Sequence, residues 1–379
     1  MNIVDQIEAT QEISLSQLKQ LLQGKEAAHL KERALAVKKK IYGRDIYIRG
    51  LIEFTSYCKN DCLYCGLRRS NQKASRYRLT EEEILACCAE GYALGFRTFV
   101  LQGGEDAFFT DERICRLVSS IKKQHPSCAV TLSIGEKDSS SYEAYRQAGA
   151  DRYLLRHETA SMSHYKILHP PEMSLLRRMK CLHSLKNIGF QTGAGFIVGT
   201  KGQTTETIFE DLQFLRRLQP HMIGIGPFIP QHDTPLAKEP AGSSEQTLLL
   251  LSILRLLFPS ALLPATTALA TLMQDGQREG ILAGANVIMP NLSPPSVRAK
   301  YAIYDKKRHT GTESAQSLNI LKEKLEAIGC TIAVDIGDFR PYPTPQEAGF
   351  PHHQTLYHQI RGNCYVQCKL HESRRIHFR

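Results

Sequence analysis

Runs with the character of buried strands alternate with runs of helical periodicity, and this alternation restricts the fold more than any other feature. The strand-like runs cover residues 47–54, 99–102, 129–134, 152–156, 195–199, 222–227, 263–267 and 286–290. The helical segments cover residues 80–95, 110–124, 139–149, 174–188, 205–218, 245–258 and 275–283. Helices that connect parallel strands cross over with the same right hand, and eight such units can close into a ring. The chain is therefore predicted to be an α/β protein with a complete (βα)8 TIM-type barrel.

Four regions are predicted around this alternation. Residues 1–48 are an N-terminal helical extension, because leucines recur on one helical face. Residues 49–304 form the barrel, and residues 305–343 hold a helix and a short strand, which we expect to be a C-terminal appendage. Residues 344–379 contain five of the fourteen histidines and few aliphatic residues, so they form a tail for which no order is predicted.

Three cysteines follow the first strand at close spacing: Cys58, Cys62 and Cys65. Thiolates are soft ligands that select iron–sulfur clusters, zinc or copper(I). Most 4Fe–4S clusters have four cysteine ligands, so three thiolates would leave one iron free for a ligand that is not protein. A zinc loop or three unrelated buried cysteines are the alternatives, but structural zinc needs four ligands and no second pair stands at a suitable distance. We therefore predict one 4Fe–4S cluster with these three cysteines as its metal ligands.

The second strand ends in a polar turn made by Gln102, Gly103, Gly104 and Glu105. Function in barrels of this kind gathers at the carboxyl ends of the strands, where the cysteine loop also begins. Paired glycines let the backbone come close to a ligand. We expect a ligand-binding turn here, and an ordinary tight turn is the alternative.

The fourth strand is followed by Arg156, His157 and Glu158. Burying these groups without partners would be costly, so they are expected to face a cavity. Glu158 can accept hydrogen bonds from hydroxyl or amino groups of a ligand, and Arg177 on the following helix can pair with a carboxylate through its planar fork. An internal arginine–glutamate pair that only holds the barrel rim is the alternative.

Hydroxyl groups and an arginine are also predicted inside the barrel. Thr131 and Ser133 alternate with apolar residues on the third strand, so they point to one face. Arg49 lies in the first strand, and Thr266 and Thr267 end the seventh. Together these residues predict an anion site; threonines on the surface beside an exposed arginine are the alternative.

The composition limits which classes of binding partner and which cellular compartment are expected. A net charge of +10 and a pI near 9.0 suit anionic ligands. A nucleic-acid binder is the alternative, and its binding would depend steeply on salt, but the basic residues are scattered. Eleven cysteines indicate a reducing compartment with metal chemistry. The chain begins without an apolar leader, and its most apolar run, residues 248–258, is too short to span a bilayer. A cytoplasmic protein with neither nucleic acid nor membrane as a partner is expected.

The cysteine spacing, with Tyr64 just before the last cysteine, resembles the signature of radical S-adenosylmethionine (SAM) enzymes. Longer runs closely resemble the HydE family of FeFe-hydrogenase maturases, which are relatives of biotin synthase with a complete barrel. These runs are residues 49–54, 62–69, 152–159, 224–230, 264–268 and 284–291. The resemblance implies that one electron from the cluster splits SAM into methionine and a 5′-deoxyadenosyl radical. It also implies a role in assembling the two-iron subcluster of the H-cluster.

The resemblance, taken with the strand-end argument, gives each candidate residue a role. The catalytic set is Cys58, Cys62, Cys65, Glu158 and Arg177. The residues expected at the SAM site are Tyr64, Gln102, Gly103, Gly104, Glu105, Thr131, Ser133, Glu158, Arg177 and Met289, although Met289 is more often a core filler. The residues expected to face the substrate are Arg49, Arg156, Thr266, Thr267, Tyr301 and Tyr304.

The implied partners are a low-potential electron donor, a small cysteine-bound iron carbonyl–cyanide substrate and the sister hydrogenase maturases. Some family members carry a second cluster after the eighth strand, but residues 301–329 contain no cysteine, so none is predicted here. Cys364, Cys368 and His371 in the tail provide three ligands without a fourth and are assigned no metal. Two alternative hypotheses for the function are another biotin-synthase-like enzyme, such as methylornithine synthase, and a non-enzymatic iron–sulfur scaffold.

Overall fold

A six-stranded parallel sheet is the central element of the computed structural model, which describes residues 2–310 and 313–341. Its strands are Gly50–Thr55 (β2), Thr98–Gly103 (β3), Ala129–Ser133 (β4), Arg152–Leu154 (β5), Gln191–Ala194 (β6) and Met222–Ile223 (β8). Each strand pairs with the next of this series in chain order. Parallel neighbours of this kind need a crossover connection, and here the crossovers are helical.

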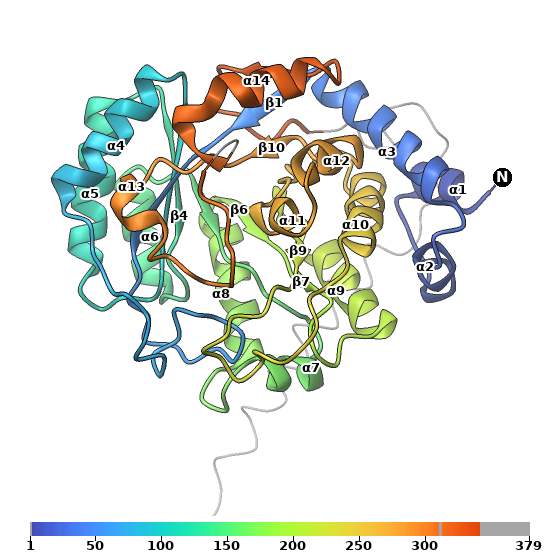
Figure 1. Cartoon of the computed structure of the whole chain (residues 1–379), viewed down its shortest axis with the longest axis horizontal. Helices are drawn as coiled ribbons and strands as arrows, with labels where there is room; N and C mark the ends of the chain where they lie inside the picture. The colour runs from blue at the N-terminus through green and yellow to red at the C-terminus, as the bar shows by residue number, and fades with distance from the viewer. Residues whose placement is uncertain (1, 311–312, 342–379) are drawn as a thin grey trace, which may run out of the picture. The chain divides into compact units, whose positions relative to one another are not determined.

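Helices cover the outside of the sheet (Figure 1). Those connecting the strands, or following the last of them, are Glu81–Ala93 (α4), Asp111–Gln124 (α5), Ser139–Gln147 (α6), Met162–Leu168 (α7), Leu175–Ile188 (α8), Thr205–Leu218 (α9), Ser244–Leu257 (α10) and Gly276–Leu282 (α12). The helical segments predicted from periodicity are therefore confirmed, and α7 is additional. The apolar side of each helix is buried, as at Ile114, Leu117 and Ile121 of α5. This is the packing expected of an amphipathic helix on a sheet.

Helix α4 begins at the capping box that the sequence predicts. The Thr80 hydroxyl accepts a hydrogen bond from the Glu83 amide at 3.2 Å, and the Glu83 carboxylate accepts one from the Thr80 amide at 2.8 Å. These bonds satisfy two amides that the helix leaves without partners, and the acidic first turn suits the positive end of the helix dipole. Gly95 follows the helix with φ of 97°, a backbone conformation that glycine adopts without strain.

Parallel pairing continues beyond the sheet. Asp45–Ile48 (β1) lies between Val287–Ile288 (β10) and Thr331–Ala333 (β11). Single bridges join Met222 to Leu262 and Pro264 to Val287. The segments at the seventh and eighth predicted positions thus lie beside one another, but the six-stranded sheet is the continuous ladder. The predicted strand 263–267 is wrong in extent, because Pro264 lacks an amide donor and the chain turns into a helix at Thr267.

The fifth predicted strand, residues 195–199, is wrong in position. The sheet strand is Gln191–Ala194, four residues earlier, and its partners are Arg152, Tyr153 and Leu154. Ile197–Val198 (β7) instead pairs with Gly226–Pro227 (β9) in a separate two-stranded sheet. The prediction chose residues 195–199 because they are more apolar. In the structure, the less apolar residues 191–194 are the ones that pair with β5.

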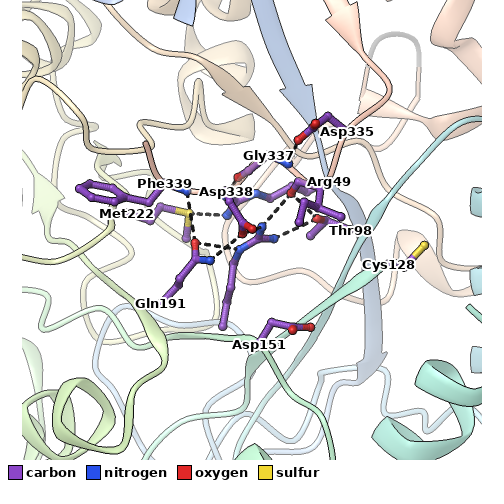
Figure 2. A network of polar contacts seen from close by, with 12 residues as sticks. Arg49, Thr98, Cys128, Asp151, Gln191, Met222, Asp335, Gly337, Asp338 and Phe339 are labelled. Carbon is purple, nitrogen blue, oxygen red and sulfur yellow. Dashed lines mark hydrogen bonds and ion pairs between the residues drawn. The ribbon is translucent and has the colours of Figure 1, made fainter. Parts of the chain in front are cut away.

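Polar side chains and the segment after β11 close the amino end of the sheet (Figure 2). The Arg152 guanidinium lies 2.6 Å from the Asp338 carboxylate and donates to the Thr98 hydroxyl at 2.9 Å. Gln191 donates to the same carboxylate at 2.6 Å. Strands β3, β5 and β6 are therefore all tied to one short C-terminal segment.

The remaining elements extend this unit. They are Ile3–Thr10 (α1), Leu15–Leu22 (α2), Ala27–Tyr42 (α3), Thr267–Leu272 (α11), Pro295–Arg298 (α13), the 3-10 helix Ala315–Ser317 (η2) and Leu318–Glu326 (α14). Helix α3 packs on α10 and α12, and α2 packs on α9. Residues 1–340 form one compact unit. The domain limits predicted at 48/49 and 304/305 therefore stay predictions. The predicted tail 344–379, with Cys364, Cys368 and His371, lies outside the described residues.

Candidate functional site

The three predicted cluster cysteines lie on the loop that follows β2, at the carboxyl end of the sheet. Cys58, Cys62 and Cys65 are half-buried free thiols. Burial raises the pKa of each thiol, to about 12 for Cys65, and the neighbouring thiols raise it further at Cys62 and Cys65. The thiols are therefore neutral unless positive charge lies among them. The iron of a cluster supplies such charge and binds the thiolate form, so this donor set fits a 4Fe–4S cluster.

Two contacts hold the cysteine loop in place. The Lys59 amide donates to the Glu105 carbonyl at 2.9 Å. The Arg68 fork holds the Asp61 carboxylate at 2.8 and 2.6 Å, and this keeps the pKa of Asp61 well below its usual range. In the described part of the chain, no three histidine, cysteine or acidic side chains converge on one ion position. A cube does not require that convergence, because each thiolate binds a different iron.

The glycine turn after β3 lies against the cysteine loop. A Cβ atom on Gly104 would be 2.2 Å from the Tyr57 carbonyl oxygen and 2.7 Å from the Cys58 Cβ, so only glycine fits. The Glu105 side chain is buried and accepts a hydrogen bond from the Glu136 amide at 2.9 Å. The turn thus brings exposed backbone groups next to the first cysteine.

A small cavity of about 190 Å³ opens beside this turn. It lies at the carboxyl ends of β2, β3 and β4, and residues of the cysteine loop and the glycine turn share its wall. Its lining includes Thr55, Lys59, Gly104, Glu105, Ile134 and Glu136. The rim is therefore hollow next to the predicted cluster.

Glu158 is held in an unusual backbone conformation at the end of β5. Its φ of 66° is left-handed, which is rare for a residue with a side chain and is common at functional sites. Its amide donates to the Gly195 carbonyl at 3.1 Å, and its carbonyl accepts from the Ile197 amide at 3.3 Å. The buried carboxylate oxygen Oε2 lies 3.0 Å from Arg156 Nη2 but outside hydrogen-bond geometry. Arg156 Nε also has no hydrogen-bond partner, so this ion pair keeps hydrogen-bonding capacity for a ligand.

The structure separates Arg177 from its neighbour Arg178. Arg177 is 57% exposed and faces Glu136 and Asp138 at 3.4 and 3.3 Å. Arg178 is buried, with Nε 2.5 Å from a Glu136 carboxylate oxygen and Nη1 donating to the Arg156 carbonyl at 2.8 Å. The charge of Arg178 also lowers the pKa of Cys62, against the larger effect of burial. Arg178 is therefore the buried arginine of the two, and the role expected for Arg177 stays a prediction.

Arg49 and Thr131 lie at the amino end of the sheet, away from the cysteine loop. Arg49 is fully buried, with Nη1 2.8 Å from Met222 Sδ and Nη2 3.5 Å from the Gly337 carbonyl (Figure 2). Burial lowers the pKa of Arg49 well below its usual value. The Thr131 hydroxyl is buried without a partner, and both residues line a small cavity with Met222. Arg49 and Thr131 therefore line the same cavity, whereas Thr266 and Thr267 are not part of its lining.

The segment after the eighth predicted strand brings two predicted tyrosines to the carboxyl end. The Tyr301 hydroxyl lies near the Gln102 side chain and the Tyr304 hydroxyl near Thr271, and burial raises the pKa of both phenols. Thr266 caps α11, and the Thr267 hydroxyl, one residue later, donates to the Glu313 carboxylate at 2.6 Å. These residues therefore lie on the same side of the sheet as the cysteines.

The other predicted residues have simpler surroundings. Tyr64 packs edge-on against His169, with ring centres 5.6 Å apart, and contacts a cluster that includes Ile197. Ser133 is the last residue of β4 and is half-buried. Met289 packs on an apolar cluster that includes Leu154. The SAM contacts expected of Tyr64, Ser133 and Met289 stay predictions.

The sequence prediction missed a group of charged residues near this end of the sheet: Glu53 and Glu313, which are buried, and Lys307, whose side chain is 9% exposed. The Lys307 ammonium lies 2.7 Å from the Glu53 carboxylate, which is fully buried in β2. A glutamate inside the apolar run 51–54 was the available signal for Glu53. No periodicity marks Lys307 or Glu313, because both lie in irregular chain.

No helix in residues 2–310 and 313–341 combines the length and the apolar character needed to cross a bilayer.

The profile of the radical SAM superfamily matches residues 52–215. The FeFe-hydrogenase maturase subunit HydE of Thermotoga maritima is 42% identical over 293 residues, which cover 77% of this chain and 83% of that protein. A 3-methylornithine synthase of Methanosarcina acetivorans is 29% identical, over 78% of this chain and 83% of that protein.

Solved structures show the same architecture. A crystal structure of methylornithine synthase gives a TM-score of 0.79 at 28% identity and covers 88% of this chain and 97% of that chain. A crystal structure of the FeFe-hydrogenase maturase HydG gives 0.73 at 21% identity, over 86% of this chain and 74% of that chain, and is alike in fold. The resemblance predicted from the motifs is confirmed: the chain is a radical SAM enzyme that belongs to the HydE family of FeFe-hydrogenase maturases.

Proposed function

We propose that Cys58, Cys62 and Cys65 hold one 4Fe–4S cluster and that the chain uses it with SAM to assemble the two-iron subcluster of the hydrogenase H-cluster. The observation that carries this proposal is the meeting, at one rim, of three thiols with the Arg156–Glu158 ion pair, whose facing atoms make no hydrogen bond. When bound, the cluster supplies the electron that splits SAM into methionine and a 5′-deoxyadenosyl radical.

Residues around the cysteines are proposed to hold SAM by its polar groups. The backbone of Gly103 and Gly104 meets the amino group, and the Arg178 guanidinium pairs with the carboxylate, the role that the sequence had suggested for Arg177. Glu158 accepts hydrogen bonds from the ribose hydroxyls, and Tyr64 lies beside the adenine. The remaining predicted contacts, those of Gln102, Glu105, Thr131, Ser133 and Met289, stay part of this proposal.

The substrate is proposed to be a small cysteine-bound iron carbonyl–cyanide complex made by a sister maturase, and the electron comes from a low-potential donor protein. Arg156, Thr266, Thr267, Tyr301 and Tyr304 face this substrate, with Arg49 deeper at the amino end. The proposal includes a complete (βα)8 barrel, which excludes water from a radical that would otherwise react without selection. It also includes a cytoplasmic location, supported by the nine free thiols in the described residues.

Anaerobic SAM cleavage tests the cluster assignment. Reconstituted Cys62→Ala should fold normally but lack the brown cluster absorption and release no 5′-deoxyadenosine under reduction, because only two thiolates remain. Cys115→Ala, in a half-buried cysteine of α5, is the matched control and should keep both signals. Normal cleavage by Cys62→Ala would refute the assignment.

A methylornithine synthase activity is the second candidate, favoured by the 29% identity and the TM-score of 0.79. Only the true substrate should strongly accelerate 5′-deoxyadenosine release, so the iron complex and lysine, an isomer of methylornithine, are compared on the same preparation. A non-enzymatic scaffold would release none with either, and its iron transfer would survive Glu158→Gln.

A further inference from the structure

The segment after α13 carries two charged residues to the carboxyl end of the sheet. It is anchored on the cysteine loop, where the Gly66 amide donates to the Ile303 carbonyl at 3.0 Å. A second anchor joins the Asn291 amide to the Glu313 carbonyl at 2.8 Å. Asn291 also donates from its side chain to the Glu53 carboxylate at 2.8 Å, and Lys307 lies on the other oxygen of that carboxylate. Glu53, Lys307 and Glu313 thus share one buried polar network.

Glu313 is the member of this network that contacts a proposed substrate residue. It is 4% exposed. Its Oε2 accepts a hydrogen bond from the Thr267 hydroxyl at 2.6 Å, and its Oε1 accepts one from the Gln277 amide. Thr267 itself is only partly buried. A ligand can therefore reach Thr267, while Glu313 lies behind it.

The protonation state of Glu313 decides what Thr267 can offer to a ligand. With Glu313 ionised, the single hydroxyl proton of Thr267 is used on the carboxylate, and the hydroxyl presents only lone pairs. With Glu313 protonated, the proton must lie on Oε2, because Oε1 already receives the Gln277 donor. The acid then donates to Thr267, and the hydroxyl proton becomes free for an acceptor on the ligand.

We propose that Glu313 is a positioning residue that takes up one proton when substrate binds and thereby turns the Thr267 hydroxyl into a hydrogen-bond donor to an anionic ligand. This inference rests on the proposed function, in which the substrate carries carbonyl, cyanide and carboxylate groups, all of them acceptors. The proton passes from solvent to Glu313 Oε2. No other covalent bond changes and no electron moves.

The surroundings of Glu313 make this proton uptake accessible near neutral pH. Burial raises the pKa of Glu313 to about 7, although the Thr267 hydrogen bond and the charges of Lys307 and Arg308 lower it and Glu53 raises it. The Tyr304 phenol, whose pKa burial raises, also faces this carboxyl and is neutral in this range. The Lys307 charge is largely balanced by Glu53 at 2.7 Å. Glu313 is therefore the group in this network that can change its charge.

The test uses the full-length holoenzyme and a cysteine-bound iron carbonyl–cyanide complex under anaerobic conditions. For the wild type, the KM of the complex should rise about tenfold per pH unit above about pH 8, while kcat changes little, because binding must then protonate Glu313. In Glu313→Gln the amide donates permanently to Thr267, so the KM should be low and independent of pH. Glu323→Gln, an exposed residue of α14, is the matched control and should keep the wild-type profile.

Infrared spectroscopy and calorimetry give readouts that do not depend on turnover. Binding at about pH 8 should take up about one proton per chain and produce a protonated-carboxyl band, and both signals should vanish in Glu313→Gln. Binding without proton uptake, or a pH-dependent KM in Glu313→Gln, would overturn the inference. If the wild type does not bind the complex, the proposed substrate and this inference fail together. If the wild type binds and turns over the complex but Glu313→Gln keeps its profile, only this inference fails.

Discussion

Arg177 and Arg178 are adjacent on α8, yet one lies at the surface and the other beside the cysteines. Arg178→Lys should raise the KM for SAM about tenfold, since lysine keeps the charge but loses the planar fork that pairs with a carboxylate. The loss corresponds to about 1.4 kcal/mol. The measurement is 5′-deoxyadenosine release as a function of SAM concentration.

The control for this prediction is Arg177→Lys, because Arg177 is 57% exposed and contacts Glu136 and the exposed Asp138 only at 3.4 and 3.3 Å. Its KM for SAM should equal that of the wild type, and both variants should melt near the wild-type temperature. A raised KM in Arg177→Lys with none in Arg178→Lys would return the role to Arg177.

At single residues, the sequence was informative where a motif fixed the position. The cysteines, the glycine turn and Glu158 stand next to strand ends, so their side of the sheet followed from chain order. The choice between Arg177 and Arg178 depends on how α8 is rotated about its axis, and packing sets that rotation. Glu313 was missed because its environment is created by Thr267 and Gln277, which come from other elements.

At the scale of elements, the helices were predicted more accurately than the strands. Helices α5, α8, α9 and α10 are each 14 residues long, whereas β6 and β8 are four and two residues long. Short buried strands carry too few residues for a period to show, and β6 contains Gly193, which is a weak strand former. Register against β5, which no local pattern reveals, selects these residues.

The glycine turn and the cysteine loop behave as one element because their backbones are in contact. Gly104→Ala should lower the iron content of the reconstituted protein, since the new Cβ would lie 2.2 Å from the Tyr57 carbonyl and must displace the loop that carries Cys58. We expect a cost of about 1–3 kcal/mol, typical of overpacking. Iron per chain and the cluster absorption are the measurements.

Gly224→Ala is the matched control for the turn. The nearest atom to its new Cβ would be a Pro264 carbon at 3.7 Å, which is ordinary contact. This variant should bind as much iron as the wild type. Equal iron content in Gly104→Ala and the wild type would show that the turn does not set the position of the loop.

Across residues 2–310 and 313–341, the two ends of the sheet differ in kind. The carboxyl end holds the cysteines, the cavity beside the glycine turn and the ion pair of Arg156 and Glu158. The amino end is closed by ion pairs and hydrogen bonds to the segment after β11. This arrangement directs ligands to one end, and the C-terminal segment contributes to the stability of the sheet.

Asp338 is the link between that segment and the sheet. Asp338→Ala should lower the free energy of unfolding by about 1–3 kcal/mol, because the buried Arg152 guanidinium would lose its carboxylate. Burial opposes ionisation, but hydrogen bonds from Gln191 and Arg152 hold the pKa of Asp338 below its usual 3.8. The carboxylate therefore stabilises the fold above about pH 4, and this contribution disappears as the pH falls through the lower folded-state pKa. Urea unfolding should thus separate variant from wild type at neutral pH and bring them together in acid. Asp335→Ala is the control, because it removes only the turn hydrogen bond that the Gly337 amide donates to Asp335. It should lower the free energy of unfolding by less than Asp338→Ala does. Equal losses of stability in the two variants would show that the Arg152–Asp338 ion pair does not hold the segment.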